Sequence, residues 1–358
     1  MGPDERNSLM AIHRSGGWHL YETPMIRLHR PKALSMSRIA RLVLAFVFVG
    51  FSVNLLAEPQ SLLAQQKRKL RPLRIALPSH TIAATHFYVG KSLGIFESHG
   101  FEPQILVLEP RAALAALMTG DLDFYTATGT TTRAALRGVP VRVIMVGLNR
   151  PDHVLVASKE ITSIEQLRGK VLGGYTAQAT VNTILIELLR RRGLKPDEYK
   201  ILNVGTARLA VLTAGNVPAA VLNGLETVKA VRQGFRPLAR AADEIELATG
   251  GLGTAMTSLQ SKRDIFRSVV QAVLESIRIS ATQKERVLPV LMKQFAIPQE
   301  DANLILDIVH KGWALDGRPT PGSQKFEFDL AQREMSLKEP PKPEQVYDFS
   351  LLDEIAKQ

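Results

Sequence analysis

The side chains that could take part in chemistry are hydroxyl, amide, imidazole and charged groups, because the chain has no cysteine. The absence of thiols excludes a cysteine nucleophile, thiolate metal ligands, disulfide bonds and the acylated cysteine of a bacterial lipoprotein anchor. The eight histidines are scattered, and no HxxxH or HExxH spacing places two imidazoles on one helix face. The sequence therefore predicts no catalytic residue, no metal site and no cofactor, and the protein is not expected to be an enzyme.

Polar and glycine residues gather in four loops, at 78–82, 128–131, 174–180 and 223–226. Each loop follows an apolar run and leads into a helix-like segment. Hydroxyl groups and backbone N–H groups at helix starts bind anions and polar head groups, although the same residue types also cap helices without a ligand. We interpret the four loops as one ligand site. Its candidate residues are Ser79, His80, Thr81, Thr128, Gly129, Thr130, Tyr175, Thr176, Gln178, Thr180, Asn223 and Glu226.

The elements that must position these loops alternate between short apolar runs and amphipathic segments. Strands are predicted at 73–77, 104–108, 123–128 and 141–148. Helices are predicted at 84–99, 111–118 and 130–137. The alternation continues from 154 to 234, and mainly helical segments follow residue 253. This order predicts an α/β fold with mostly parallel sheets, in which ligands lie outside the carboxyl ends of the strands.

An internal repeat divides the predicted fold into two similar halves. Residues 112–124 (AALAALMTGDLDF) match residues 207–219 (ARLAVLTAGNVPA) at an offset of 95, and two further pairs of segments match at offsets of 96 and 93. Two repeats of this length are too long for a solenoid and indicate two α/β lobes. A ligand cleft is then expected where the lobes meet.

Four segments also carry a family resemblance. In chain order they are 91–97 (KSLGIFE), 115–124 (AALMTGDLDF), 161–174 (ITSIEQLRGKVLGG) and 212–222 (LTAGNVPAAVL). With them, the chain from about residue 73 to 313 resembles periplasmic substrate-binding proteins of the nitrate/sulfonate/taurine ABC importer class, which includes binders of the pyrimidine precursor of thiamine. Pro218 and Gly224 depart from the residues usual in that family.

The resemblance implies a two-lobed type II binding fold, each lobe a mostly parallel or mixed sheet flanked by helices. Lobe 1 is expected to comprise 73–150 and 253–358 with the C-terminal helices, and lobe 2 to comprise 151–252. Such a protein captures a small polar or anionic solute, sulfonate-, nitrate-, taurine- or pyrimidine-like, by lobe closure. It then delivers the solute, as a monomer, to an inner-membrane ABC permease and its ATPase. The alternatives are an enzyme on the same fold, such as a pyrimidine-precursor synthase, and a sensor or scaffold that no longer serves transport.

The N-terminal region indicates export. Residues 36–57 combine a basic start, an uncharged apolar run and a cleavage site after Ala57, with Ala64 as the other option. They are typical of a signal peptide and predict a periplasmic protein, whereas an uncleaved segment would anchor it to the inner membrane. Residues 1–35 are interpreted as an upstream extension and 58–72 as a basic linker.

The basic net charge does not indicate nucleic-acid binding. The chain carries a formal charge of +11, but residues 1–57 hold 7 Lys+Arg and 3 Asp+Glu, which leaves 38 and 31 for the remainder. Five of those basic residues lie between 65 and 74, and only 6% of the residues are aromatic. A solvated linker accounts for this excess better than a basic surface interleaved with stacking side chains, so no nucleic-acid partner is expected.

Overall fold

The computed structural model describes residues 69–175 and 179–358, which belong to one contact unit. The predicted extension at 1–35 and the signal peptide at 36–57 lie outside the described residues. The last two residues of the predicted linker 58–72 belong to the first strand, which begins at Arg71. No helix within the described ranges is both long enough and apolar enough to cross a membrane.

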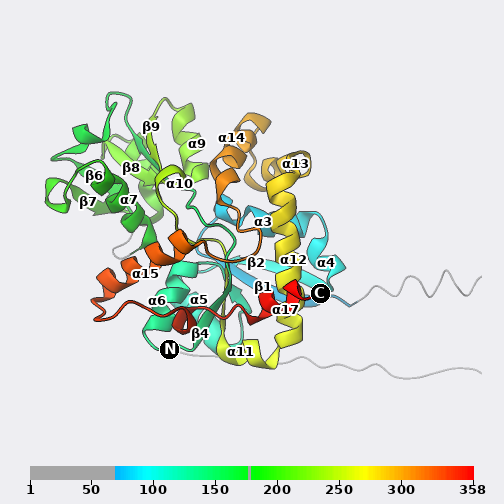
Figure 1. Cartoon of the computed structure of the whole chain (residues 1–358). Coiled ribbons are helices and arrows are strands. Elements are labelled where there is room, and N and C mark those ends of the chain that lie inside the picture. The colour runs from blue at the N-terminus through cyan, green and yellow to red at the C-terminus, as the bar shows by residue number, and fades with distance from the viewer. Residues whose placement is uncertain (1–68, 176–178) are drawn as a thin grey trace, which may run out of the picture. The chain divides into compact units, whose positions relative to one another are not determined.

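Two five-stranded mixed sheets form the framework (Figure 1). The first sheet has the order β2-β1-β3-β10-β4. Its strands are β1 (Arg71–Leu77), β2 (Phe101–Val107), β3 (Phe124–Tyr125), β4 (Val141–Met145) and β10 (Leu252–Ala255). The second sheet has the order β7-β6-β8-β5-β9. Its strands are β5 (Val154–Ala157), β6 (Val171–Gly174), β7 (Lys200–Asn203), β8 (Ala219–Leu222) and β9 (Arg236–Arg240).

The two sheets share one topology, which confirms the two-lobed α/β fold that the repeat predicts. In the first, β1 pairs in parallel with β2 and β3, and β10 runs antiparallel to β3 and β4. In the second, β6 pairs in parallel with β7 and β8, and β5 runs antiparallel to β8 and β9. We call the elements around each sheet the first and second lobe. The lobe boundaries at 150/151 and 252/253 stay a prediction.

The helices of the first lobe enclose a large apolar core. They are α3 (Thr85–Ser92), α4 (Ile95–Ser98), α5 (Pro110–Thr119), α6 (Thr128–Leu136), α11 (Met256–Ser261), α12 (Arg263–Thr282), α13 (Lys284–Phe295), α14 (Gln299–Val309), α16 (Pro343–Val346) and α17 (Ser350–Ala356). The longest, α12, buries Phe266, Val270 and Ile277 along one face, and the Phe266 ring lies 4.4 Å from the ring of Phe124 in β3. Helical spacing of apolar residues therefore explains how this helix covers the sheet.

The second lobe has a smaller core. Its helices are α7 (Thr180–Arg191), α8 (Arg208–Thr213), α9 (Gly224–Arg232) and α10 (Ala241–Glu244). Helix α7 buries Ile184, Leu185, Leu188 and Leu189 against this core, the pattern of an amphipathic helix on a sheet. Short 3₁₀ helices lie at Ile82–Ala84, Ile164–Leu167, Pro196–Glu198, Gly205–Ala207 and His310–Gly312.

Several predicted elements differ from the structure in ways that local chemistry explains. The single helix predicted at 84–99 is broken into α3 and α4, because Gly94 adopts a left-handed conformation with φ 71°. The strand predicted at 123–128 is only two residues long, since Thr128 already starts α6. The strand predicted at 141–148 ends at Met145, where the chain leaves the first sheet.

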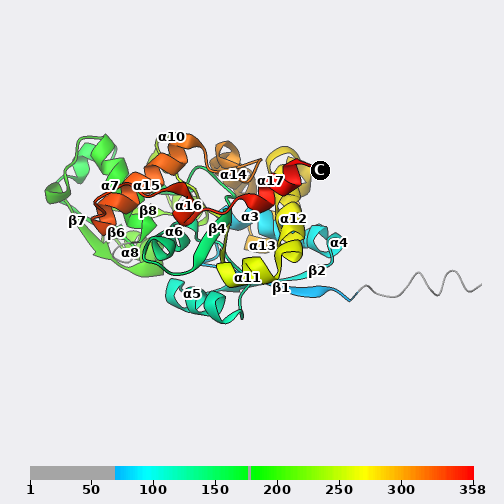
Figure 2. The same ribbon diagram turned by 60° about the horizontal axis from the view of Figure 1, so that its bottom comes forward.

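Helix α15 (Pro321–Met335), in the proline-containing tail, was not predicted. Thr320 caps its start by accepting a 3.0 Å hydrogen bond from the Ser323 backbone N–H, and Pro321 occupies the first helical position, where its missing N–H costs nothing. The helix lies beside α6 and α7 (Figures 1 and 2). Phe326 packs against the core of the second lobe, and Glu327 pairs with Arg133 of α6 at 3.2 Å. The C-terminal region therefore contacts both lobes.

Two segments connect the sheets and run side by side. One follows β4 and the other precedes β10, and Leu148 and Thr249 exchange two backbone hydrogen bonds of 2.9 and 2.8 Å between them. A Cβ atom on Gly147 would lie 2.2 Å from the carbonyl oxygen of Gly250, and one on Gly251 would lie 2.1 Å from that of Met145. Glycine is needed here because backbone atoms of neighbouring segments fill the space that a side chain would take.

Alanine at Gly147 is therefore expected to lower the free energy of unfolding by about 2 kcal/mol, because a backbone oxygen has little room to move away. Chemical denaturation of the purified protein would measure the loss. Gly322→Ala is the matched control, since the atom that its Cβ would meet is the carboxylate end of the flexible Glu246 side chain. An equal, small effect of both substitutions would contradict the close approach at the connection.

Candidate ligand-binding site

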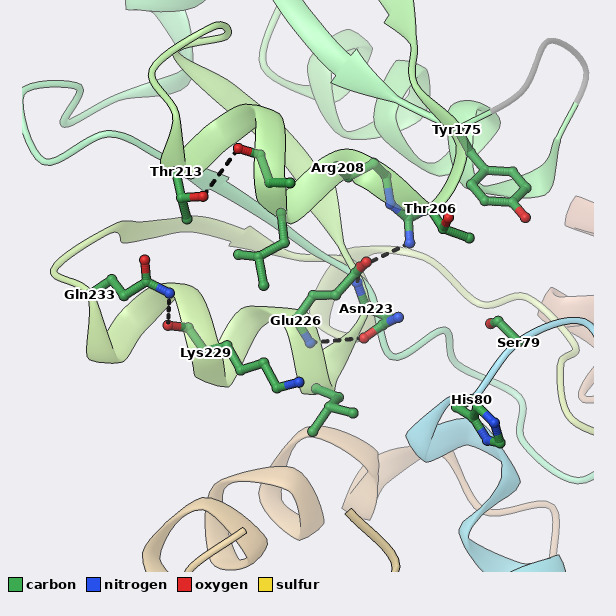
Figure 3. Close-up of a pocket in the computed structure, with 13 residues that line it drawn as sticks. Ser79, His80, Tyr175, Thr206, Arg208, Thr213, Asn223, Glu226, Lys229 and Gln233 are labelled. Carbon is green, nitrogen blue, oxygen red and sulfur yellow. Dashed lines mark hydrogen bonds and ion pairs between the residues drawn. The ribbon is translucent and has the colours of Figure 1, made fainter. Parts of the chain in front are cut away.

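A cavity of about 510 Å³ lies where loops of both lobes meet (Figure 3). Its walls come from the segments that follow the carboxyl ends of β1, β6, β7 and β8. This is the edge of an α/β sheet at which ligands commonly bind. The lining residues are Ser79, His80, Tyr175, Thr206, Arg208, Leu209, Ala210, Thr213, Asn223, Leu225, Glu226, Lys229 and Gln233.

The first lobe contributes the short segment after β1. Ser79 lines the cavity, and His80 lies exposed at its edge with Nδ1 3.4 Å from the hydroxyl oxygen of Tyr88 in α3. Burial raises the pKa of Tyr88 to about 12, so this hydroxyl is protonated at neutral pH. This wall therefore presents the Ser79 hydroxyl group and the His80 imidazole ring, with the buried Tyr88 hydroxyl behind the ring.

The second lobe contributes a capping box at the start of α9. The Asn223 side-chain oxygen accepts from the Glu226 backbone N–H at 2.9 Å, and Glu226 Oε2 accepts from the Asn223 backbone N–H at 3.0 Å. The sequence N-G-L-E thus fixes both side chains at the helix start. Because the oxygen of Asn223 is used in the cap, its amide nitrogen is the group that faces Ser79 across the cavity (Figure 3).

Arg208 of α8 is a site residue that sequence reasoning missed. Only 4% of it is exposed, and its Nη2 donates to Glu226 Oε2 at 2.8 Å. Its guanidinium carbon lies 5.1 Å from the centre of the Tyr175 ring, an arrangement that favours a cation–π interaction. Burial raises the pKa of Tyr175, with the Glu109 carboxylate adding to the effect. The repeat offset of 95 pairs Arg208 with Ala113, which is fully buried in the first lobe. An arginine at a position where the other repeat has an apolar residue could have indicated a site residue.

Asp152 and His153 were also missed, and they connect the two lobes next to the cavity. Asp152 is 2% exposed and accepts from the Thr81 hydroxyl at 3.2 Å and from the Gly224 backbone N–H at 3.4 Å. His153 Nδ1 lies 3.4 Å from Asp152 Oδ1, but burial lowers the pKa of this imidazole. A Cβ atom on Gly224 would lie 2.0 Å from Ile82 Cδ1, so a side chain at this position would have to displace the end of the buried Ile82 side chain.

The structure brings five of the predicted site residues together around this cavity. They are Ser79, His80, Tyr175, Asn223 and Glu226. Five others do not line it, and their role in ligand binding stays a prediction. They are Thr81, Thr128, Gly129, Thr130 and Thr180. The remaining two, Thr176 and Gln178, lie outside the described residues.

Residues 128–131, predicted as a loop, form the first turn of α6 and pack where the lobes meet. The Thr128 hydroxyl is buried and donates to the Ala248 carbonyl oxygen at 2.7 Å. A Cβ atom on Gly129 would lie 3.1 Å from Thr180 Oγ1, so these two predicted residues are neighbours across the lobes. Similarly, the Thr81 hydroxyl both caps the 3₁₀ helix at Ile82–Ala84 and bonds to Asp152.

The cavity offers hydrogen bonding and charge. Arg208 and Lys229 are cationic, Glu226 is anionic, and Ser79, Thr206 and Thr213 supply hydroxyl groups. No group of three or more His, Asp or Glu side chains placed to hold a metal ion occurs within residues 69–175 and 179–358. Such a lining can bind a small polar or charged molecule through side chains of both lobes.

The comparisons with known proteins agree with the two-lobed α/β fold. The family model described as NMT1/THI5 like matches residues 81–286. No curated protein sequence matches the chain. Among solved structures, the ligand-binding component of an ABC-type import system from Staphylococcus aureus is 14% identical with a TM-score of 0.67, covering 80% of this chain and 100% of its own. The periplasmic aliphatic sulphonate-binding protein SsuA from Escherichia coli is 17% identical with a TM-score of 0.64, covering 79% and 99%.

The same fold occurs in an enzyme. The desulfurization enzyme DszB is 12% identical with a TM-score of 0.61, covering 80% of this chain and 99% of its own. At these identities the likeness concerns the fold, which is the two-lobed type II fold of periplasmic binding proteins. The fold therefore supports ligand binding between the lobes, and the choice between carrier and enzyme depends on the residues of the site.

Proposed function

Because the chain belongs to the NMT1/THI5-like family, we propose that it is the solute-binding protein of an ABC importer. It captures a small polar or anionic solute between its lobes. The observation that carries this proposal is the cavity to which both lobes contribute polar side chains from strand ends, Ser79 from the first and Asn223 from the second. A solute that contacts both walls stabilises the arrangement in which the lobes approach each other, and so shifts the population toward it.

The predicted signal peptide at 36–57 supports a periplasmic location for this carrier. In that compartment it would work as a monomer and deliver its solute to an inner-membrane permease and the associated ATPase. The import-system component from Staphylococcus aureus and the sulphonate-binding protein from Escherichia coli support this role, because both have the same fold. Subcellular fractionation with an antibody against the protein would test the location.

An enzyme on this fold is the second candidate, favoured by the likeness to DszB. The lining of the cavity gives it less support than the carrier. The chain has no cysteine, and His80 is the only histidine among the described residues that line the cavity; its Nδ1 lies 3.4 Å from the Tyr88 hydroxyl oxygen. A nucleophile activated by a neighbouring base requires hydrogen-bonding distance between the two groups. Among the described residues, the hydroxyl group at that distance from His80 belongs to Tyr88, which does not line the cavity. Turnover of a bound solute by the purified protein would favour the enzyme.

A binding screen tests the carrier directly. The protein without residues 1–57 is titrated with sulfonates, nitrate, taurine, pyrimidines, carboxylic acids and amines, and thermal unfolding is followed. A cognate solute at 100 times its Kd is expected to raise the free energy of unfolding by about 2.7 kcal/mol. Stability that no solute in the panel changes would count against the proposal.

Asn223→Asp is expected to weaken binding of an anionic solute by about tenfold, because it removes the amide nitrogen that faces the cavity and adds a negative charge beside Glu226. The aspartate keeps the oxygen that caps α9, but it lacks the amide nitrogen that faces the cavity. Isothermal titration calorimetry would measure the change. Asn216→Asp makes the same chemical change at an exposed turn that does not line the cavity, so it should leave affinity unaltered. Unchanged affinity in Asn223→Asp would remove this residue from the site.

A further inference from the structure

Arg208 is the buried cation of the cavity, and most of its hydrogen-bonding capacity is unused. One nitrogen, Nη2, donates to Glu226. The other two, Nε and Nη1, are buried and have no hydrogen-bond partner in the described part of the chain. Buried donors without acceptors are costly, and guanidinium nitrogens match the oxygens of a planar or tetrahedral acid group in pairs. Nε and Nη1 lie on different edges of the guanidinium, and each can act as a paired donor only together with the second N–H of Nη2, whose first N–H donates to Glu226. The wall of the cavity therefore still offers one edge with two donors to an acid group.

Glu226 places a negative charge beside these donors. Its carboxylate is held at the wall by two hydrogen bonds, from Arg208 Nη2 at 2.8 Å and from the Asn223 backbone N–H at 3.0 Å. The carboxylate therefore stays close to any group bound at Arg208. A like charge brought into such a place is disfavoured, and the effect is large because the surroundings are only partly solvated.

The Tyr175 ring lies over the guanidinium group and covers it on one side. Tyr175 is only half-buried, so its side chain has room to turn toward solvent. An acid group that enters from the cavity binds at the edge of the guanidinium, where the N–H groups point, and not on the face that the ring covers. The aromatic ring is left available to pack against the body of the solute.

We infer that Arg208 and Glu226 together make this cavity select singly charged organic acids, sulfonates or carboxylates, over doubly charged oxyanions. Arg208 binds the acid group, and Glu226 repels a second negative charge. The inference rests on the proposed function, since it assigns a specificity to the same cavity. It differs from a general preference for anions because the selectivity is set by a carboxylate that the sequence builds into the wall.

Calorimetry at pH 8 tests this selectivity with defined probes. Methanesulfonate, benzenesulfonate and benzoate are the singly charged probes, and sulfate and inorganic phosphate are the doubly charged ones. The unaltered protein is expected to bind at least one singly charged probe about tenfold or more tightly than either doubly charged one. Arg208→Lys keeps the charge but loses the paired donors, and it should weaken that probe by about 10- to 100-fold. Glu226→Gln should reduce the ratio between the affinity for the singly charged probes and the affinity for the doubly charged ones.

Arg236→Gln is the matched control. It removes one positive charge from the second lobe but leaves the buried pair intact, and its side chain is exposed and does not line the cavity. Its effect is expected to stay below about threefold, since exposed charges are screened. Far-ultraviolet circular dichroism and melting temperature of each variant report whether it is folded. Glu226→Gln also retains an oxygen for the helix cap, so it offers a readout even where the Arg208 variant is unstable.

The outcomes separate the inference from the proposed function. Undiminished affinity in Arg208→Lys, or an unchanged ratio in Glu226→Gln, overturns the inference while solute binding stands. Binding of only neutral or cationic solutes overturns it in the same way. Failure to bind any solute in the wider screen overturns the proposed function, and the inference with it.

Discussion

Methionine in place of Arg133 is expected to lower the free energy of unfolding by about 3–5 kcal/mol. The guanidinium group of Arg133 in α6 donates to Glu327 at 3.2 Å and to Glu334 at 2.6 Å, both on α15. Glu327 is only 1% exposed, and burial raises the pKa of its carboxyl group. Without the arginine, the buried carboxylate loses its counter-charge and must either stay charged at high cost or take up a proton.

The loss is expected to depend on pH. A carboxyl group whose folded pKa lies above the unfolded value of 4.5 binds protons more readily in the folded state, so its contribution to stability falls as pH rises above that value. The positive charge of Arg133 lowers the pKa of Glu327, so its removal raises this pKa further. The pH range in which Glu327 destabilises the folded state then extends to higher pH. The deficit of Arg133→Met should therefore be larger at pH 7.5 than at pH 5, as measured by urea denaturation.

Two further variants make the comparison specific. The double variant Arg133→Met with Glu327→Leu removes both buried charges, and it should regain much of the stability that the single variant loses. Arg137→Met changes an exposed arginine at the end of the same helix and should be nearly neutral. A single variant as stable as Arg137→Met would show that the buried pair contributes little.

This cluster also bears on lobe movement. The Thr183 hydroxyl of α7 donates to Glu334 at 2.8 Å, so α15 is bonded to α6 of the first lobe and to α7 of the second. The bond to Thr183 is single and exposed, whereas the bonds to Arg133 are buried and charged. Phe326 of α15 also packs against the core of the second lobe, so separation of the lobes has to break either this apolar contact or the ion pairs with Arg133.

The sequence predicts the framework because the signals for it are local. Apolar runs and the glycines that end helices recur at an offset near 95 residues, and β3 and β8 begin at Phe124 and Ala219 with the same offset. What it does not show is the source of the antiparallel strand in each sheet. β5 comes before its lobe's parallel strands, but β10 returns to the first sheet from more than 100 residues away. Pairing over such a distance depends on tertiary packing.

Helix α15 was missed for a related reason. Prolines such as those at 319, 321 and 340 often mark turns and loops, yet proline at the first position of a helix is favourable. Its fold depends on Phe326 and Glu327, which find their partners in the second lobe's core and on α6. Those partners are distant in sequence, so the helix has little apolar periodicity of its own to reveal it.

The sequence predicts a site residue correctly where its position in a loop after a strand is enough to place it at the cavity. Ser79, Tyr175 and Asn223 follow strand ends, and the cavity lies at those ends. Thr128 follows a strand end as well, but its hydroxyl is used by the Ala248 carbonyl oxygen, a partner that comes from a distant segment. Arg208 lies within a helix, so a search of loops passes over it. Comparison with the buried Ala113 of the other repeat would have found it.

Acidification is expected to destabilise the protein through His86, which lies buried in α3. Burial lowers its pKa to about 3, and its contact with the Gly250 backbone offsets only part of the effect. The rings of Phe87 and Trp313 lie beside it, at 4.1 and 5.8 Å between centroids. In the unfolded chain the imidazole titrates near its ordinary value of 6.5. Between pH 6.5 and pH 3 the unfolded state therefore binds the additional proton.

The direction in which stability changes with pH follows from this difference in proton binding. Stability rises with pH where the unfolded state binds more protons, so the contribution of His86 is complete above pH 6.5 and is lost as pH falls through the window toward 3. Each pH unit within the window costs about 1.4 kcal/mol, which gives a loss of about 3 kcal/mol between pH 7.5 and pH 4.5. Urea denaturation at intervals of half a pH unit would measure the slope.

Leucine at position 86 is expected to flatten that slope, because it fills a similar volume and does not titrate. Part of the pH dependence should remain, since burial also lowers the pKa of His153. His310→Leu is the control, as this histidine is exposed and its removal should leave the slope unchanged. A His86→Leu protein that loses stability with acid as steeply as the unaltered chain would assign the effect elsewhere. Since His86 packs against Gly147 and Gly250, a flattened slope would place the acid-sensitive group at the connections between the lobes.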